Sequence, residues 1–480
     1  MTILPPPTTP WDTPDRDARL AGTEIYNSVI DLIGNTPLVR LGRLELAMQM
    51  PCPLVIKWEV TNPGGSSKDR PALEMILAAE RSGELKPGGT IVEPTSGNTG
   101  VGLAIVAAHR GYKCMFVTTN KVVPERIDAL RAYGAEVVVC DVALPPEHPE
   151  SYYSTAERLA RETPNAYRPN QYANPNNPAA HEKTTGPEIW RQTGGCITHF
   201  VAGAGTCGTI TGTGRFLKRM NPGMQIIAAD PDASVFSGGS GRPYLIEGVG
   251  EDFFPAAWDP SVYDDIIACS DEEAYLMARR VAKEEAVLLG SSGGLAVAAA
   301  IKLKDRLTPD DLVVVLIPDS GRAYVSRVFN DEWMAGYGFL RECDQCVGAV
   351  LDARGGGLPS LLYVNPQTTV RNAIFLMRAN GVSQLPVCKN EPPFAAAEVA
   401  GSVDELALMD AAFKNADAMN MPVERVMGPK LPTIGVGQKV ELAVQLLERA
   451  PALLVLSGGR PLSILTRTDV LSYLGIATHG

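Results

Sequence analysis

The chain has 480 residues, which is too long for one ordinary domain, so about two to four folded units are expected. Its 45% hydrophobic and 20% charged residues are typical of a soluble globular protein with a large buried core. The net charge of −11 argues against nucleic acid or an anionic membrane as a partner.

The cysteines and the N-terminus favour a cytoplasmic protein. The nine cysteines are scattered and mostly lie in apolar runs, which is typical of reduced, buried thiols. The one C-x-x-C motif, Cys343 to Cys346, has no second pair or histidine cluster near it, so no metal site is expected, and a redox role is only weakly indicated. The N-terminus lacks the features of a secretory signal, and no apolar run is long enough to span a bilayer.

Residues 1–25 are rich in proline and in alternating Asp and Arg, which predicts an extended N-terminal tail. From residue 26 to residue 335, short apolar runs alternate with helical patterns. This alternation predicts an α/β fold with open, mostly parallel sheets that are covered by helices. Strands are expected near residues 54–60, 114–118, 136–140, 199–202, 225–229 and 312–317.

In such folds ligands bind beyond the carboxyl ends of the strands, so the loops that follow the strands carry the candidate site. The first loop, Asn62–Arg70, is rich in glycine and serine and delivers Lys68 to the start of a helix. The positive end of that helix, together with burial, would lower the pKa of the amine, as a Schiff-base lysine requires. The alternative is a surface lysine after a flexible loop.

The second loop, Pro94–Gly100, follows an expected strand at residues 90–93 and leads into a helix. Its hydroxyl and amide side chains and its free backbone N–H groups form a suitable cradle for a carboxylate. N-capping by Ser96 or Thr99 would account for two of the hydroxyls. It would not account for seven consecutive small or polar residues.

The third loop, Gly203–Gly212, combines threonine hydroxyls with glycines that permit close backbone approach, a pattern typical of phosphate binding. It lacks the Gly-Lys-Ser/Thr of a nucleoside-triphosphate loop. The fourth loop, Gly290–Gly294, places serine hydroxyls at the start of an alanine-rich helix. A reactive lysine, a carboxylate cradle, a phosphate cup and a neutral hydroxyl together indicate pyridoxal 5′-phosphate acting on an amino acid.

These four loops resemble those of the cysteine synthase/cystathionine β-synthase family, pyridoxal-phosphate enzymes of fold type II. The likeness runs from about Tyr26 to Met334, with the motifs in the family's order. Residues 171–175, 244–255 and 318–334 favour the cystathionine β-synthase branch. The resemblance implies two open α/β subdomains within residues 26–335. It also implies condensation of L-serine with L-homocysteine to L-cystathionine and water, in the transsulfuration route to cysteine.

The resemblance assigns roles to individual residues. Lys68 would hold the cofactor covalently and act as the general base at the substrate Cα. Asn98 would hydrogen-bond the ring hydroxyl, and Ser292 would meet the pyridine nitrogen as a neutral group. Tyr172 and Glu247 would lie near the second substrate. The phosphate would be bound by Gly205, Thr206, Cys207, Gly208 and Thr209, and the substrate carboxylate by Thr95, Ser96, Gly97, Asn98 and Thr99.

Two features depart from the family pattern. Cys207 stands where the family usually has glycine, and a cysteine costs free energy there if the backbone φ is positive. Animal relatives bind haem through a Cys and a His on an N-terminal extension. Residues 1–25 contain neither, so no haem is expected.

Residues 336–357 are rich in glycine and small residues and are predicted to be a linker. Beyond it, in residues 358–480, Val370, Ala373 and Met377 recur as Val440, Ala443 and Leu447, all at helical spacing. A short strand follows each helix, and then a strand that leads into a second helix. This repeat resembles a tandem pair of CBS domains, a regulatory module that binds adenosyl ligands.

In that module a hydroxyl residue and an acidic residue at the last strand–helix junction contact phosphate or ribose. The corresponding pairs here are Ser402 with Glu405 and Thr466 with Asp469. Since Ser-x-x-Glu is also a capping box, capping is the favoured interpretation for Ser402 and Glu405. For Thr466 and Asp469, capping and ligand binding both remain open. S-adenosylmethionine is the expected effector, because it reports on the methionine cycle that homocysteine leaves.

Three other functions compete with this prediction. A cysteine synthase, acting on O-acetylserine and sulfide, would use every cofactor contact named above. A catalytically inactive sensor of adenosyl ligands would keep the fold without the chemistry. Threonine dehydratase shares the fold type but normally carries a different regulatory domain. The chain itself is expected to form a homodimer or homotetramer.

Overall fold

The computed structural model describes residues 25–95, 97–120, 122, 124–141, 148–340, 345–354, 361–415 and 417–477. The chain divides into two compact units. The first contains the residues up to 237, together with 247–269 and 280–323. The second contains 238–246, 270–279 and the residues from 324 onward. Nearly all of the expected tail, and Cys343, lie outside the described residues.

The first unit contains a six-stranded sheet that is parallel except at one edge. Its strand order is β1 (Leu38–Arg40), β2 (Leu54–Trp58), β10 (Val313–Ile317), β7 (His199–Gly203), β8 (Gln225–Pro231) and β9 (Asp265–Cys269). β1 pairs antiparallel with β2, and the other neighbouring strands are parallel. Every residue of β10 is buried, as expected for an apolar strand in the middle of a covered parallel sheet.

A second, four-stranded sheet in this unit is wholly parallel. Its order is β5 (Glu136–Cys140), β4 (Lys113–Thr119), β3 (Thr90–Pro94) and β6 (Ala166–Tyr167). The strands expected from the sequence are therefore confirmed in both sheets, with boundaries that differ by only one or two residues. The prediction of open, mostly parallel α/β subdomains is correct.

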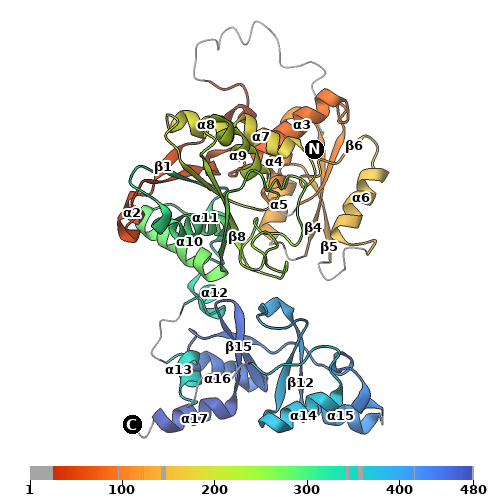
Figure 1. Cartoon of the computed structure of the whole chain (residues 1–480). Coiled ribbons are helices and arrows are strands. Elements are labelled where there is room, and N and C mark those ends of the chain that lie inside the picture. The colour runs from red at the N-terminus through yellow and green to blue at the C-terminus, as the bar shows by residue number, and fades with distance from the viewer. Residues whose placement is uncertain are drawn as a thin grey trace. The chain divides into compact units, whose positions relative to one another are not determined.

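Helices surround both sheets of the first unit (Figure 1). Three of them, α3, α4 and α9, begin directly after the glycine-rich loops that follow β2, β3 and β7. α7 and α9 pack so closely that a Cβ on Gly212 would overlap the Pro178 carbonyl. The helix bounds are α2 (Gly42–Met48), α3 (Asp69–Ser82), α4 (Asn98–Arg110), α5 (Pro124–Ala132), α6 (Tyr152–Glu162), α7 (Asn176–Lys183), α8 (Thr185–Gln192), α9 (Gly208–Met220), α10 (Asp271–Glu285) and α11 (Ser291–Lys302).

The second unit repeats a helix–strand–strand–helix motif, as the sequence predicts. The first copy contains α14 (Val370–Asn380), β11 (Gln384–Cys388), β12 (Val399–Asp404) and α15 (Glu405–Lys414). The second contains α16 (Val440–Arg449), β14 (Ala452–Ser457), β15 (Arg460–Thr466) and α17 (Arg467–Ala477), with β13 (Thr433–Gly435) pairing with β14. The helices of both copies lie on one side of β12 and β15 (Figure 1).

The two copies differ in the connection between their paired strands. In the second copy only two glycines separate β14 from β15, whereas residues 389–398 separate β11 from β12. The predicted linker also contains structure. Residues 347–352 form helix α13, whose Val347 and Val350 are buried in the core of the second copy. A shorter helix, α12 (Asp331–Gly336), precedes it.

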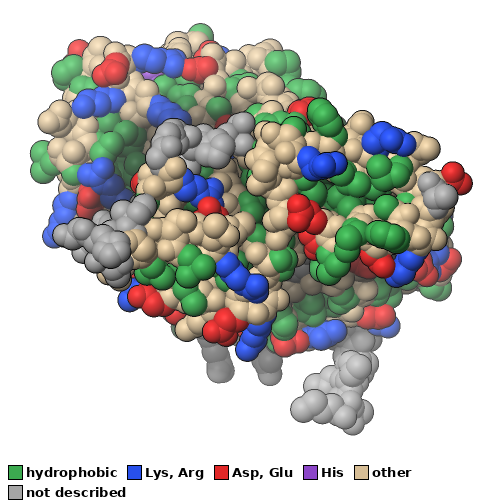
Figure 2. Space-filling view, turned by 90° about the horizontal axis from the view of Figure 1, so that it is seen from below, with side chains coloured by type: hydrophobic (Ala, Val, Ile, Leu, Met, Phe, Trp, Pro, Cys, Tyr) green, Lys and Arg blue, Asp and Glu red, His purple; other side chains and the backbone are tan. Residues whose placement is uncertain are grey.

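Apolar side chains remain exposed on the helices of the second unit, among them Leu406, Phe413 and Leu471. Figure 2 shows a face on which hydrophobic patches lie among acidic and basic side chains. Charges of both signs are interspersed there, which does not favour binding of a polyanion to that face.

No helix in the described part of the chain is long and apolar enough to cross a membrane.

Candidate active site

The lysine loop is tied to the end of β10. The Ser67 N–H donates to the Pro318 carbonyl at 2.8 Å, and Ser66 forms a bridge with Asp319. Lys68 follows directly and precedes α3, so the predicted position at a helix start is confirmed. Burial lowers the pKa of the Lys68 amine, although the Asp319 and Glu251 carboxylates act in the opposite direction. The amine is therefore easier to deprotonate than that of a surface lysine.

A buried carboxylate closes this loop. Asp69 accepts a hydrogen bond of 2.5 Å from the Gly64 N–H. A Cβ on Gly64 would overlap the same carboxylate, so the close approach requires glycine. Burial raises the pKa of Asp69 to about 7, although the Gly64 hydrogen bond opposes this shift. The loop before Lys68 is held from within and is not a flexible surface segment.

A buried network of two cations and two carboxylates anchors the residue that follows. Arg70 pairs with Glu59 at 2.6 Å and with Glu188 at 2.7 Å, and Lys57 pairs with Glu188 at 2.8 Å. Although burial opposes ionisation, the hydrogen bonds of Arg70 lower the pKa of Glu188 to about 2. The network joins β2 and α8 to the start of α3. Sequence reasoning missed it, since its members are spread over more than a hundred residues.

The second loop has a different capping pattern from the one considered from sequence. Thr95 Oγ1 accepts the Gly100 N–H at 3.1 Å, whereas Thr99 Oγ1 donates to Gln171 at 2.7 Å. Capping by Thr99 is therefore wrong, and Ser96 lies outside the described residues. Asn98, the first residue of α4, donates to Asp319 Oδ2 at 2.8 Å. This contact brings the second loop to the same strand end as the lysine loop.

The third loop enters α9 through a strained residue. Cys207 has a φ of 63°, in the left-handed region, so its backbone does occupy the conformation that favours glycine. A Cβ on Gly205 would lie 2.9 Å from the Gly248 carbonyl, so this position tolerates no side chain. Thr206 Oγ1 accepts from Asn177 Nδ2 at 3.1 Å. The cup is thus closed on one side by Gly248 and on the other by α7.

A buried histidine supports the same loop and was missed from sequence. His181 on α7 lies 3.1 Å from Thr209 through Nε2 and 2.9 Å from Thr185 through Nδ1. Burial, together with the nearby Arg70 and Lys68 charges, lowers its pKa well below the ordinary value. It is therefore a neutral hydrogen-bonding group.

The fourth loop is formed without a preceding strand. The run before Gly290 makes only an isolated bridge, Leu289 to Ser320. Ser291 and Ser292 are buried in the first turn of α11. Ser291 Oγ accepts the Glu247 N–H at 3.2 Å, which ties α11 to the segment that covers the third loop.

The two residues expected near the second substrate have different environments. Glu247 forms an ion pair of 2.9 Å with Arg126. The Tyr172 ring packs against Phe253, with 5.3 Å between the ring centroids, and burial raises the pKa of Glu251, two residues before Phe253, to about 7. Burial also raises the pKa of Tyr172 well above its ordinary value. Sequence reasoning did not single out Glu251.

A further buried carboxylate positions the Tyr172 loop. Glu93, on β3, accepts the N–H groups of Asn170 at 2.9 Å and of Gln171 at 3.0 Å. Burial raises its pKa to about 7 in spite of these hydrogen bonds. Since Gln171 in turn holds Thr99, β3 orients both the second loop and the segment before Tyr172.

The assembled groups fit pyridoxal 5′-phosphate. Lys68 supplies an amine with a lowered pKa, and the first N–H groups of α9, from Gly208 and Thr209, have no partner within their helix and suit a phosphate. Any side chain at Gly205 would fill the space beside the Gly248 carbonyl in the phosphate cup. The described residues contain no cluster of His, Cys, Asp and Glu that could hold a metal ion.

The candidate regulatory residues of the second unit are already engaged with each other. Asp469 Oδ2 accepts the Thr466 N–H at 2.7 Å and the Thr466 hydroxyl at 2.6 Å. Arg354, from the end of α13, forms an ion pair of 2.6 Å with Asp469 and donates to the Ile464 carbonyl at 2.7 Å. A ribose at this carboxylate would have to displace that guanidinium.

The capping interpretation of Ser402 and Glu405 is wrong. Ser402 lies within β12, and its hydroxyl donates to the Pro429 carbonyl at 2.7 Å. α15 is capped by Asp404, which accepts the Ala407 N–H at 2.7 Å. Alternate residues of β12 are buried through Val403, so the strand continues to Asp404 before the helix begins. The position that corresponds to Asp469 is therefore Ala407, which has no carboxylate.

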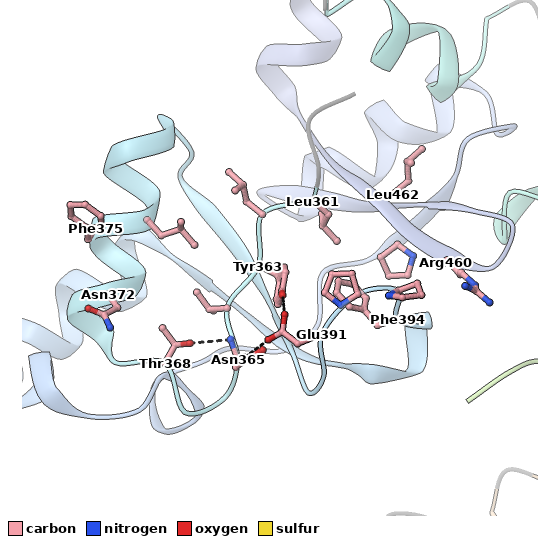
Figure 3. A pocket seen from close by; sticks show the side chains of 16 residues that line it. Leu361, Tyr363, Asn365, Thr368, Asn372, Phe375, Glu391, Phe394, Arg460 and Leu462 are labelled. Atoms are coloured by element: carbon pink, nitrogen blue, oxygen red, sulfur yellow. Dashed lines mark hydrogen bonds between the residues drawn. The ribbon is translucent and has the colours of Figure 1, made fainter. Parts of the chain in front are cut away.

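The second unit also contains a pocket of about 830 Å³ (Figure 3). Its walls include Phe375 from α14, Phe394 from the long β11–β12 connection and Leu462 from β15. Tyr363 and Asn365 both point toward Glu391 and hydrogen-bond its carboxylate. None of the four candidate regulatory residues lines this pocket.

Comparisons with known proteins agree with this arrangement. A family model described as "Pyridoxal-phosphate dependent enzyme" matches residues 29–319, and one described as "CBS domain" matches residues 358–393 and 423–476. The chain is 41% identical to "Cystathionine beta-synthase" of Oryctolagus cuniculus over 78% of this chain and 70% of that protein. It is 35% identical to "Cystathionine beta-synthase" of Dictyostelium discoideum over 94% of this chain and 92% of that protein.

The chain spans about two thirds of the length of the mammalian relatives that it matches. Among solved structures, "O-acetylserine dependent cystathionine beta-synthase from Helicobacter pylori" is 36% identical to the chain, with a TM-score of 0.59. That match covers 63% of this chain and 98% of the other.

Proposed function

Because this chain belongs to the cysteine synthase/cystathionine β-synthase family of pyridoxal-phosphate-dependent lyases and carries C-terminal CBS domains, we propose that it condenses L-serine with L-homocysteine. The products are L-cystathionine and water, the transsulfuration step that leads from homocysteine toward cysteine. The observation that carries this proposal is the match to the Dictyostelium cystathionine β-synthase, which runs through both units of the chain.

The lysine loop supplies the proton transfers. Pyridoxal 5′-phosphate, when bound, would withdraw electrons from the substrate Cα and so allow the β-hydroxyl group to leave. Lys68 holds the cofactor and moves the proton at Cα, a role that its lowered pKa supports. Ser292 meets the pyridine nitrogen with a neutral hydroxyl, and Asn98, oriented by Asp319, hydrogen-bonds the ring hydroxyl.

The start of α4 holds the substrate carboxylate. The backbone N–H groups of Asn98 and Thr99 lie in the first turn of this helix and that of Gly97 lies at its N-cap, where the macrodipole favours an anion. Thr95 keeps the turn closed through its bond to Gly100, and Ser96 belongs to the same loop. The phosphate is bound at the start of α9 by residues 205–209, and Tyr172 and Glu247 lie near the second substrate.

Product analysis tests the reaction. The purified protein, loaded with pyridoxal 5′-phosphate, is incubated with serine and homocysteine, and in parallel with O-acetylserine and sulfide, and the products are identified by mass spectrometry. Cystathionine should form with the higher kcat/KM. Efficient cysteine formation without cystathionine would identify a cysteine synthase instead. A purified protein with no yellow absorbance band would favour the inactive adenosyl-ligand sensor.

A second candidate for the first substrate is O-acetylserine. The Helicobacter pylori structure supports it, since that protein is described as an O-acetylserine-dependent cystathionine β-synthase and is 36% identical to this chain. Acetate is a better leaving group than hydroxide, so the same site would accept either donor. To decide between the two donors, homocysteine is offered together with equal amounts of serine and O-acetylserine. The ratio of acetate released to cystathionine formed then gives the share of the product that comes from O-acetylserine.

The second unit binds S-adenosylmethionine as an effector, at the junction of β15 and α17. Asp469 with Thr466 contacts the ribose there once Arg354 moves aside, whereas Ser402 and Glu405 contribute little, because they do not occupy the corresponding positions in the first copy. Calorimetry with S-adenosylmethionine tests the proposal. Absence of heat at high micromolar ligand would refute it.

The assembly and surroundings of the protein complete the proposal. It is a cytoplasmic homodimer or homotetramer that acts on small amino acids and has no haem. Light scattering on the purified protein gives the assembly size, and a monomer at micromolar concentration would contradict it. A Soret band in protein purified from haem-supplemented cells would contradict the absence of haem.

A further inference from the structure

Two carboxylates on one segment of the first unit differ in their partners. Glu247, which was expected near the second substrate, is already neutralised by Arg126 at 2.9 Å. Among the described residues, no Lys, Arg or His side chain forms an ion pair with Glu251, four residues later. A charged carboxylate in a partly buried site without a cation is unfavourable. Asp252 is exposed, so Glu251 is the half-buried carboxylate of this segment that can accept a cationic group from outside.

The backbone around Glu251 is held rigidly. Its N–H donates to Ser234 Oγ at 3.1 Å, and its carbonyl accepts the Val235 N–H at 3.1 Å. One residue earlier, the Gly250 N–H donates to the Ala204 carbonyl at 2.6 Å. These bonds fix the start of the Glu251 side chain beside the loop that forms the phosphate cup. The carboxylate is thus positioned by the fold rather than left to solvent.

The groups that face the Glu251 carboxyl place it in the active site. The segment of Glu251 contacts Tyr172, because the Tyr172 ring lies 5.3 Å from that of Phe253 and the Ala256 N–H donates to the Tyr172 carbonyl at 3.1 Å. The charge of Glu251 also acts on the Lys68 amine. The other charged groups near it are Asp252 and Asp230, both of which oppose its ionisation. Burial acts in the same direction and raises the pKa of Glu251 to about 7. An ammonium group beside Glu251 would offset both the burial and the repulsion by Asp252 and Asp230, because a nearby positive charge favours the ionised carboxylate.

We propose that Glu251 binds the α-ammonium group of the thiol substrate, and that it thereby selects an amino-acid thiol over sulfide. This inference rests on the proposed β-replacement activity and names the group that recognises its second substrate. Homocysteine carries an ammonium group that sulfide lacks, so only the former gains from the carboxylate.

Thiol selectivity tests the inference. E251Q keeps the shape of the side chain and removes its charge. E247Q tests the competing carboxylate of the same segment, and E125Q, at an exposed position on α5, is the control. For each variant kcat/KM is measured with serine and three thiols, namely homocysteine, sulfide and 2-mercaptoethanol, after the absorbance of bound cofactor has confirmed loading. The ratio of homocysteine to 2-mercaptoethanol should fall about ten- to hundredfold in E251Q, the loss expected for one charge-assisted hydrogen bond.

The same experiment can overturn the inference. An unchanged ratio in E251Q, or an equal loss of activity with all three thiols, would show that Glu251 does not recognise the ammonium group. A larger fall of the ratio in E247Q would transfer the role to Glu247. If the wild-type chain makes no cystathionine, the proposed function fails. The ratio of L-cysteine to sulfide as the attacking thiol then tests Glu251 separately, because L-cysteine also carries an ammonium group.

Discussion

The two units of this chain satisfy their polar groups in different ways. At the candidate active site, Asn98 bonds Asp319, Thr99 bonds Gln171 and Arg70 pairs with Glu188, so the partners come from distant parts of the sequence. At the strand–helix junctions of the second unit, Asp404 and Asp469 bond groups only three residues away. Local bonds of this kind arise wherever a helix is capped. Polar residues at a helix start therefore indicate a site mainly when their partners come from elsewhere in the fold.

The largest expected effect lies in the lysine loop. Lys68→Ala should lower kcat by about a thousandfold or more, because it removes the group that moves the proton at Cα. The yellow absorbance of bound cofactor should disappear, while the circular dichroism spectrum stays that of a folded protein. Lys86→Ala, at an exposed position, is the control. A variant at residue 68 that kept its turnover would remove the basis for assigning the active site to these loops.

Breaking the long-range network should have the next largest effect. Glu188→Ala leaves the Lys57 and Arg70 charges buried with fewer partners, which should lower the free energy of unfolding by about 3–5 kcal/mol. Glu162→Ala removes an exposed pair with Arg158 and should cost about 0.5 kcal/mol or less. Urea denaturation measures both changes. Equal costs would mean that the distant pairing in the first unit is no more important than a surface ion pair.

A smaller effect is expected at the strained residue of the phosphate cup. Cys207→Gly and Cys207→Ala both remove the buried thiol, but only alanine retains a side chain at a φ of 63°. The glycine variant should therefore be more stable than the alanine variant by about 1 kcal/mol. Thermal unfolding of the pair measures the difference. Equal stabilities would show that the left-handed backbone at residue 207 carries no strain.

The smallest effect concerns a distant partner at a second-unit junction. Arg354 reaches Asp469 from α13, so Arg354→Gln should free the carboxylate and raise the affinity for S-adenosylmethionine about two- to fivefold. Calorimetry measures the change, with the exposed Arg378→Gln as the control. A weaker affinity in Arg354→Gln would instead show that Arg354 itself contacts the ligand.

Much of the fold could be predicted because its signals are local. Apolar runs identified seven of the ten strands of the two sheets but missed β1, β6 and β9, which lie at sheet edges. The seventy-residue repeat of Val370 and Val440 identified the second unit. The register at the end of β12 could not be predicted in this way. The motif Ser402 to Glu405 has the form of a capping box, but alternate burial along β12 carries the strand on to Asp404, and the cap moves with it.

The groups that sequence reasoning missed at the candidate site share one property. Glu93, His181 and Glu251 are single titratable residues outside any glycine-rich motif, and each acts on a loop that lies elsewhere in the sequence. Nothing local distinguishes His181 and Glu251 from ordinary surface residues. Glu93 lies within an apolar strand, which is a local signal, because a carboxylate there must find partners when the strand is buried.

The sequence by itself determined the order of strands and loops, the position of Lys68 at a helix start and the repeated second unit, because these depend on periodicity and on neighbouring residues. The tertiary structure decided which loops meet. It brought Asp319 to Asn98 and to the lysine loop, and it joined the segment of Glu251 to the phosphate cup through Gly250 and to Tyr172 through Phe253. Burial decided the protonation of these groups, since a pKa responds to surroundings that only the folded chain assembles.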